Sequence, residues 1–126
     1  MILGLGTDIV EIIRVKTALE RTPKFASRIL SSEELSEYEQ QRFPERYLAK
    51  RFAVKEAVAK ALGTGIGRGV GWHHIRVERS ESGQPKLLLT EGAKRIADQL
   101  GITHWHLSYS DEQQYVVAQV IAEARL

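Results

Sequence analysis

The spacing of apolar and polar residues changes character along the chain, from alternating to helical and back. Residues 2–10 carry apolar side chains at positions 3, 5 and 9 and glycines at positions 4 and 6, which predicts a strand. Glycine within a strand commonly marks the close approach of another backbone or of a ligand. Asp8 is unexpected in a buried strand, because an unpaired carboxylate is costly there. It therefore either caps the next helix from the end of the strand or belongs to a site.

A helical region follows the first strand. The spacing predicts a helix over residues 10–19 and a further helical turn or two over residues 25–30. The sequence Ser-Ser-Glu-Glu that comes next is a capping box, in which Ser31 caps a new helix and Glu34 reaches back to it. We expect this acidic helix to end before Pro44.

The longest predicted helix spans residues 44–63. It begins at a proline, which suits a first helical position, and ends at a glycine, which suits a left-handed stop. One stripe of this helix combines small and charged side chains, which is an odd choice for a solvated face. The stripe consists of Ala49, Ala53, Glu56 and Lys60. Small side chains would let another segment approach and partly enclose the charges, although a Glu–Lys pair at this spacing is usually an ordinary surface pair.

The rest of the chain returns to alternating spacing, interrupted by one helix. The expected elements are a strand over residues 72–79, its hairpin partner over 86–90, a helix over 91–100 closed by Gly101, and a second hairpin over 103–110 and 114–122. This order predicts an α+β fold in which an antiparallel sheet accompanies a long central helix. The length predicts a single domain, residues 1–126.

Composition narrows the function classes. An apolar content of 43% and a charged content of 27% are ordinary for a soluble globular protein. The absence of cysteine excludes disulfides, thiolate metal sites and a cysteine nucleophile. Nothing in the sequence resembles a signal peptide or a membrane span, so we expect a cytoplasmic protein with no membrane partner.

Basic residues gather in two blocks, residues 11–30 with a net charge of +3 and residues 42–60 with a net charge of +4. Between them, residues 31–41 carry four glutamates and no basic residue. The two blocks indicate an anionic partner, although solvated helix faces look similar. A non-enzymatic anion-binding or nucleic-acid-binding module is one alternative. The acidic interruption and the lack of an aromatic stacking set argue against nucleic acid.

The usual catalytic and nucleotide-binding motifs are absent, including a Walker A loop, a dinucleotide fingerprint and Gly-x-Ser-x-Gly. The four histidines show no zinc-ligand spacing and are interpreted as sheet residues, with His106 as a weaker site candidate. The remaining candidates for a catalytic or metal-binding site are Asp8 and Glu56, near basic residues and the glycine loop of residues 63–67. Mg²⁺ is typically bound by one or two protein carboxylates, with water and substrate phosphates as its other ligands. Asp8 and Glu56 could therefore bind Mg²⁺ while Lys60 contacts a phosphate oxygen. The backbone N–H groups of the loop could face an anion.

Two stretches resemble the signature motifs of the 4′-phosphopantetheinyl transferases. They are residues 6–12, followed by Arg14, and residues 51–61. The likeness is closest to the small, trimeric holo-acyl-carrier-protein synthase branch of that family. It continues through residues 63–67, the turn at residues 83–85 and the strand at residues 106–110, so it covers nearly the whole chain.

The resemblance implies that the protein transfers 4′-phosphopantetheine from coenzyme A to a serine of apo-acyl carrier protein and releases adenosine 3′,5′-bisphosphate. It implies that Asp8 and Glu56 hold Mg²⁺, and that these two residues and Lys60 are catalytic. Either Lys60 or a metal-bound water takes the serine proton. The implied coenzyme A-binding residues are Arg51, Lys60, Gly63, Thr64, Gly65 and Pro85. The implied carrier-docking residues are Arg14, Arg21, Lys24, Phe25 and Arg28.

This chain departs from the family pattern at Gln84, where many relatives carry lysine, and at Asp111, where several carry histidine. The resemblance also implies a homotrimer with sites at the subunit interfaces. Independently, the final strand over residues 115–121 is apolar on both faces along most of its length. A lone antiparallel sheet usually shows one polar face to water, so we expect another subunit to cover this one. A charge at Val117 or Val120, whichever faces the neighbour, should then produce a monomer.

Overall fold

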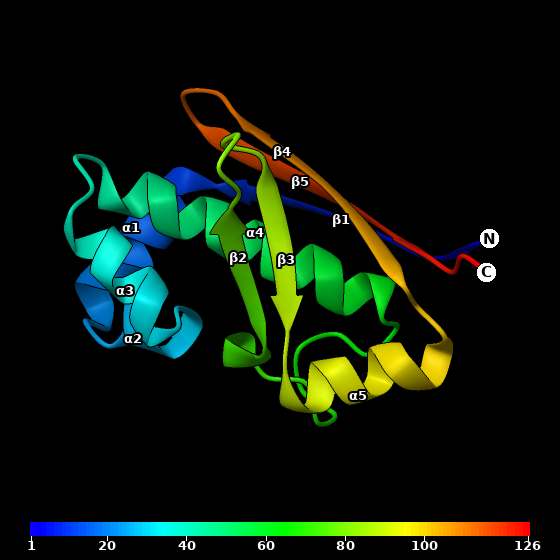
Figure 1. Ribbon diagram of the computed structural model, residues 1–126. Helices are drawn as coiled ribbons and strands as arrows, with labels where there is room; N and C mark the ends of the chain where they lie inside the picture. The colour runs from blue at the N-terminus through cyan, green and yellow to red at the C-terminus, as the bar shows by residue number, and fades with distance from the viewer.

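A computed structural model describes all 126 residues, and the fold is α+β, as expected (Figure 1). The elements are β1 (Ile2–Glu11), α1 (Ile12–Arg21), α2 (Phe25–Ile29), α3 (Ser32–Glu39), α4 (Pro44–Ala61), β2 (Ile75–Arg79), β3 (Pro85–Leu89), α5 (Glu91–Leu100), β4 (His104–Asp111) and β5 (Tyr115–Glu123). Helices α1, α2 and α3 cluster beside the first half of α4, and α5 lies near its other end (Figure 1). No helix is long and apolar enough to cross a membrane.

The strands form two antiparallel sheets. β5 lies between β1 and β4 in a three-stranded sheet, while β2 and β3 form a separate hairpin. The β1–β5 pairing places Asp8 opposite Ala118, and it continues to Glu11 opposite Tyr115. Because this pairing holds the backbone extended through Glu11, α1 begins at Ile12, two residues later than predicted.

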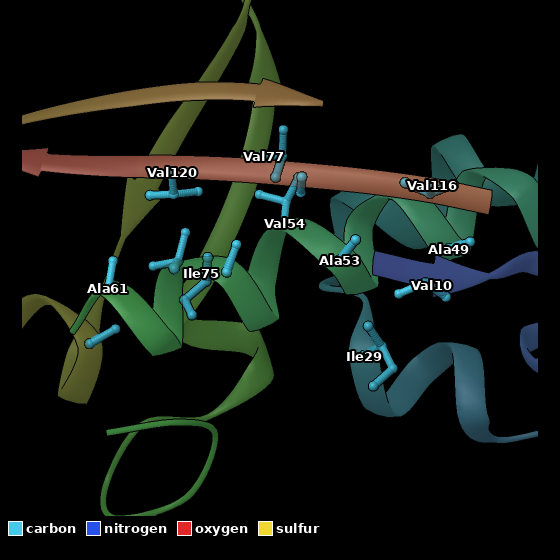
Figure 2. Packing of buried hydrophobic residues seen from close by; sticks show 14 of the residues in the cluster. Val10, Ile29, Ala49, Ala53, Val54, Ala61, Ile75, Val77, Val116 and Val120 are labelled. Carbon is cyan, nitrogen blue, oxygen red and sulfur yellow. The ribbon is translucent and has the colours of Figure 1, made fainter. Parts of the chain in front are cut away.

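α4 is the helix around which the two sheets are arranged. One face packs on β1 and β5, and another contacts β2. Figure 2 shows Val116 and Val120 of β5 on one side of α4 and Ile75 of β2 on another. The buried side chains of β5 alternate with exposed ones, which is the pattern of a strand with one face on the core.

The opposite face of the three-stranded sheet has no cover within the chain. We call it the outer sheet face, and its apolar side chains are Leu3, Leu5, Ile9, Val117 and Ile121. Leu5 is 63% exposed and Ile9 is 65% exposed. Val117 is also exposed, whereas Val120 has no exposed surface and faces α4. Of Val117 and Val120, only Val117 is therefore placed where it could contact a neighbouring subunit.

Glycine in β1 allows the strand backbone to lie directly on the helix backbone. A Cβ atom on Gly6 would lie 1.7 Å from the carbonyl oxygen of Ala57. On Gly4 it would lie 2.2 Å from the carbonyl oxygen of Ala61. The predicted close approach is confirmed, and the approaching group is the main chain of α4.

Replacing Gly6 with alanine is expected to lower the free energy of unfolding by about 1–3 kcal/mol or more, because the helix backbone cannot retreat. Gly71→Ala is the matched control, since a Cβ there meets no atom nearer than 3.5 Å. Thermal unfolding followed by circular dichroism measures both. A Gly6→Ala protein that melts at the temperature of the control would contradict this packing.

The helix boundaries mostly follow their local signals. Ser31 Oγ accepts from the Glu34 N–H at 3.3 Å, and Glu34 Oε1 accepts from the Ser31 N–H at 3.0 Å, which confirms the capping box. Gly63 and Gly101 have φ values of 80° and 82°, the left-handed stops that were predicted. The strand expected from position 72 begins at Ile75 instead, because Trp72–His74 forms a 3₁₀ turn.

Candidate active site

Asp8 lies within β1, where its side chain points toward α4 beside the two close-packed glycines. Lys60 of α4 donates from Nζ to Asp8 Oδ1 at 3.0 Å and to the Thr7 carbonyl oxygen at 3.0 Å. The second carboxylate oxygen, Oδ2, is buried and has no hydrogen-bond partner. Asp8 is therefore not the helix cap considered above, because that position is Glu11 and has no side-chain cap bond.

Glu56 lies one helical turn before Lys60 and is half-buried. Burial raises the pKa of the Glu56 carboxyl, and the nearby Asp8 charge raises it further, while Lys60 opposes both. Two carboxylates thus share one site with a single ammonium group. The surface-pair interpretation of Glu56 and Lys60 is wrong, because Lys60 pairs with Asp8 across the two elements.

The donor set fits a hard divalent cation such as Mg²⁺. An unpartnered buried carboxylate oxygen next to a carboxyl that resists ionisation is the arrangement that a bound cation would relieve. No group of three or more histidine, aspartate or glutamate side chains has metal-binding geometry in the structure. Mg²⁺ does not need such a group, because water and phosphate oxygens commonly complete its coordination.

The glycine loop after α4 does not present its amides as expected. The Gly63 N–H donates to the Lys60 carbonyl oxygen, and the N–H groups of Thr64 and Gly65 donate to that of Ala59. The Gly67 N–H is likewise donated within the loop. The N–H groups of Gly63, Thr64 and Gly65 therefore close the end of the helix and do not face an anion in this structure. The loop still adjoins the site, since it begins three residues after Lys60.

Arg51 lies elsewhere on α4 and is only 2% exposed. Its guanidinium carbon stacks 4.7 Å from the centre of the Tyr47 ring, and its nitrogens lie 3.4 Å from carboxylate oxygens of Glu34 and Glu37. The structure therefore does not bring Arg51 together with Asp8, Glu56 and Lys60 within one chain.

Arg51 instead contributes to a separate cavity of about 450 Å³, which we call the cationic pocket. Its lining residues are Glu37, Gln40, Gln41, Arg42, Phe43, Arg46, Tyr47, Lys50, Arg51, Arg79 and Tyr109. Arg46 donates to Asp111 Oδ2 at 2.8 Å, and Lys50 lies 3.2 Å from Oδ1. Burial would raise the pKa of Asp111, but these two cations outweigh it and lower that pKa. Sequence reasoning did not single out Arg46 and Lys50, which line this pocket, although both belong to the second basic block.

The residues predicted for carrier docking lie on α1, on α2 and in the turn between them, near Asp8. A groove of about 280 Å³ is lined by Asp8, Arg14, Phe25 and Phe52, among others. The Phe25 and Phe52 ring centres are 6.2 Å apart, so the groove has an aromatic wall. The other basic residues predicted for docking are also exposed: Arg21 at the end of α1, Lys24 just before α2 and Arg28 on α2.

Pro85 and Gln84 do not line this groove. They line a cleft of about 380 Å³ between β3 and β4, together with His106. His106 Nε2 lies 2.8 Å from Glu123 Oε1. This contact is the main cause that lowers the pKa of Glu123, with Arg125 acting in the same direction and burial against it.

The structure thus brings together an aspartate of β1 with a glutamate and a lysine of α4, a set of side chains that a divalent cation and an anionic group would fit. The sequence matches the family described as the 4′-phosphopantetheinyl transferase superfamily over residues 4–120. The chain belongs to this superfamily, so it is an enzyme rather than a passive anion-binding module.

Individual relatives agree with that assignment. The holo-[acyl-carrier-protein] synthase of Vibrio campbellii is 55% identical over 98% of both chains. The crystal structure of the Neisseria meningitidis enzyme of the same name is 43% identical, with a TM-score of 0.92, and the match covers 98% of this chain and 99% of that one. A Bacillus anthracis enzyme of this name, solved in complex with CoA (3′,5′-ADP), is 35% identical with a TM-score of 0.83 and 99% coverage of both.

Proposed function

We propose that this protein transfers 4′-phosphopantetheine from coenzyme A to a serine hydroxyl of apo-acyl carrier protein, with Mg²⁺ as cofactor and adenosine 3′,5′-bisphosphate as the second product. The observation that carries the proposal is the buried, unpartnered Oδ2 of Asp8, beside Glu56 and bonded through Oδ1 to Lys60. The resemblance of the chain to a synthase solved with coenzyme A supports the choice of substrate. The reaction would supply active carrier for lipid biosynthesis in the cytoplasm.

The chemistry requires charge stabilisation more than covalent participation by the protein. Asp8 and Glu56 would hold Mg²⁺, which when bound stabilises the charge that develops on the diphosphate. Lys60 would exchange its bond to Asp8 for a phosphate oxygen, since its side chain is 49% exposed and can reach outward. Packing of the Gly4 and Gly6 backbone on α4 fixes the strand that carries Asp8 relative to the helix that carries the other two groups.

We propose that three copies assemble through the outer sheet face. Its apolar side chains lie on adjacent paired strands, with Leu5 opposite the partly buried Ile121 and Ile9 opposite Val117. A continuous exposed apolar patch of this kind usually marks an interface. The arrangement would let the cationic pocket of one subunit, with Arg51, complete the site at Asp8 of its neighbour. Coenzyme A would then also meet Pro85 or the loop residues Gly63, Thr64 and Gly65.

Incubation of the protein with coenzyme A, Mg²⁺ and an apo carrier protein tests the function directly. We expect the carrier to gain the mass of one phosphopantetheine group. A carrier whose acceptor serine is replaced by alanine and a reaction that contains a chelator serve as controls. A carrier that stays unmodified in the complete reaction would refute the proposal.

The docking surface gives a separate prediction. Charge reversal of Arg14 and Arg28 should raise the KM for the acidic carrier about tenfold and weaken its dependence on salt, because attraction between opposite charges is lost. The KM for coenzyme A should stay unchanged. Lys94→Glu on α5 is the control, since Lys94 is exposed and belongs to neither surface. Equal changes in both KM values would assign these arginines to coenzyme A binding instead.

A further inference from the structure

Lys55 is a charged side chain in the middle of α4 that has no exposed surface. Its Nζ donates to the Ile29 carbonyl oxygen at 2.7 Å and to Glu34 Oε1 at 2.6 Å. Burial of an ammonium group is unfavourable unless the group is paired and fully hydrogen-bonded. Lys55 directly precedes Glu56 in the sequence, yet the proposed chemistry gives it no role.

The partner of Lys55 joins several elements. Glu34 is 2% exposed and belongs to the capping box at the start of α3. Its Oε2 accepts from the Val77 N–H of β2 at 3.3 Å and lies 3.4 Å from Arg51 Nε. One buried carboxylate therefore connects α3, α4 and β2, and Lys55 extends this connection to the end of α2.

α2 has only five residues, which is too short for a helix to hold its own position. Ala26 and Ile29 pack in the hydrophobic core, and three further contacts hold α2. They are the Lys55–Ile29 hydrogen bond, the 2.9 Å bond between His73 Nε2 and the Ser27 carbonyl oxygen, and the packing of Phe25 on Phe52. The Lys55 bond is the buried one. It also comes from the residue next to Glu56, so it links the docking helix to the helix that carries the site.

We propose that Lys55 is a positioning residue, which holds α2 and its docking side chains in a fixed place relative to Glu56. This inference rests on the proposed function, because carrier docking on α2 is part of that proposal. Rates depend steeply on how two reactants are placed. A docking helix that loses its anchor should therefore impair productive binding of the carrier and leave coenzyme A binding intact.

The test is Lys55→Met, which keeps the length of the side chain but removes the donor to Ile29 and Glu34. We expect the KM for the carrier to rise about tenfold with an unchanged KM for coenzyme A. Amide hydrogen exchange should become at least about tenfold faster in α2 and stay unchanged in α5. Lys55→Met combined with Glu34→Gln is the second variant if the single variant does not fold, because it also removes the buried carboxylate charge that has lost its lysine partner.

Ile102→Ala separates positioning from a general loss of stability. Ile102 is buried in the loop between α5 and β4, which lies across the molecule from α2 (Figure 1). Loss of this apolar volume should destabilise the fold without changing the carrier KM. A wild-type carrier KM in the folded Lys55 variants, unchanged exchange in α2, or an equal KM rise in Ile102→Ala would each overturn the proposal.

Failure of the proposed function would look different, because the wild-type protein would then leave the carrier unmodified. In that case hydrogen exchange alone decides about Lys55. Faster exchange confined to α2 in the Lys55 variants supports its role as the anchor of this helix, and unchanged exchange overturns it.

Discussion

Asp8→Asn and Glu56→Gln are each expected to reduce phosphopantetheine transfer by about 10³-fold, because each removes a charged ligand from the proposed Mg²⁺ site. The fold should persist, since both amides match the shape of the carboxylates and neither side chain fills core volume. Loss of the Asp8 charge also frees Lys60, whose Nζ lies 3.0 Å from Oδ1. The measurement is the initial rate of carrier modification by mass spectrometry, with circular dichroism to verify folding.

Asp98→Asn is the matched control for this pair, because Asp98 is an exposed carboxylate on α5 that pairs only with Lys94. It should transfer at the wild-type rate. Near-normal turnover of Asp8→Asn or Glu56→Gln at low Mg²⁺ concentration would rule out the metal site at these two residues.

Val117→Glu is expected to convert the protein to a monomer and to abolish most of its transfer activity. The substitution places a charge on the outer sheet face, where it would be buried without a partner in the proposed trimer. Multi-angle light scattering measures the assembly, and the carrier assay measures the activity. We expect both to fall together, because each site would draw residues from two subunits.

Leu88→Glu is the control for assembly, since Leu88 on β3 is 39% exposed, close to the 37% of Val117, but lies outside the outer sheet face. It should remain an active trimer. A wild-type protein that is monomeric and fully active would disprove both the assembly and the shared site.

Local signals predicted most of the secondary structure. The capping box at Ser31 and the glycine stop at Gly63 act within a few residues, so they can be interpreted without knowledge of the fold. The start of the first helix could not be found in this way. It depends on β1 pairing with β5, a contact between residues more than a hundred positions apart.

The candidate site was predictable only in part, for the same reason. Asp8 and Lys60 are 52 positions apart, and no periodicity connects them. Their pairing follows from the resemblance to a family, and the structure brings them together. Helical spacing left open an ordinary surface pair between Glu56 and Lys60, but Lys60 pairs instead with Asp8 of the strand that packs on the helix. The loop amides were misjudged because those of Gly63, Thr64 and Gly65 donate to carbonyl oxygens in the last turn of the helix.

The pairing of β1 with β5 has a consequence for how the protein is made. β1 has no other strand partner, so it cannot join a sheet until the ribosome has released β5. The long helix depends only on near neighbours in the chain, so it can form before β5 is available. Asp8 precedes these elements in the chain, yet the sheet that holds its strand in place beside Lys60 would be complete only in the last stage of folding. A nascent chain that stalls before residue 118 should have the helix but no assembled active site.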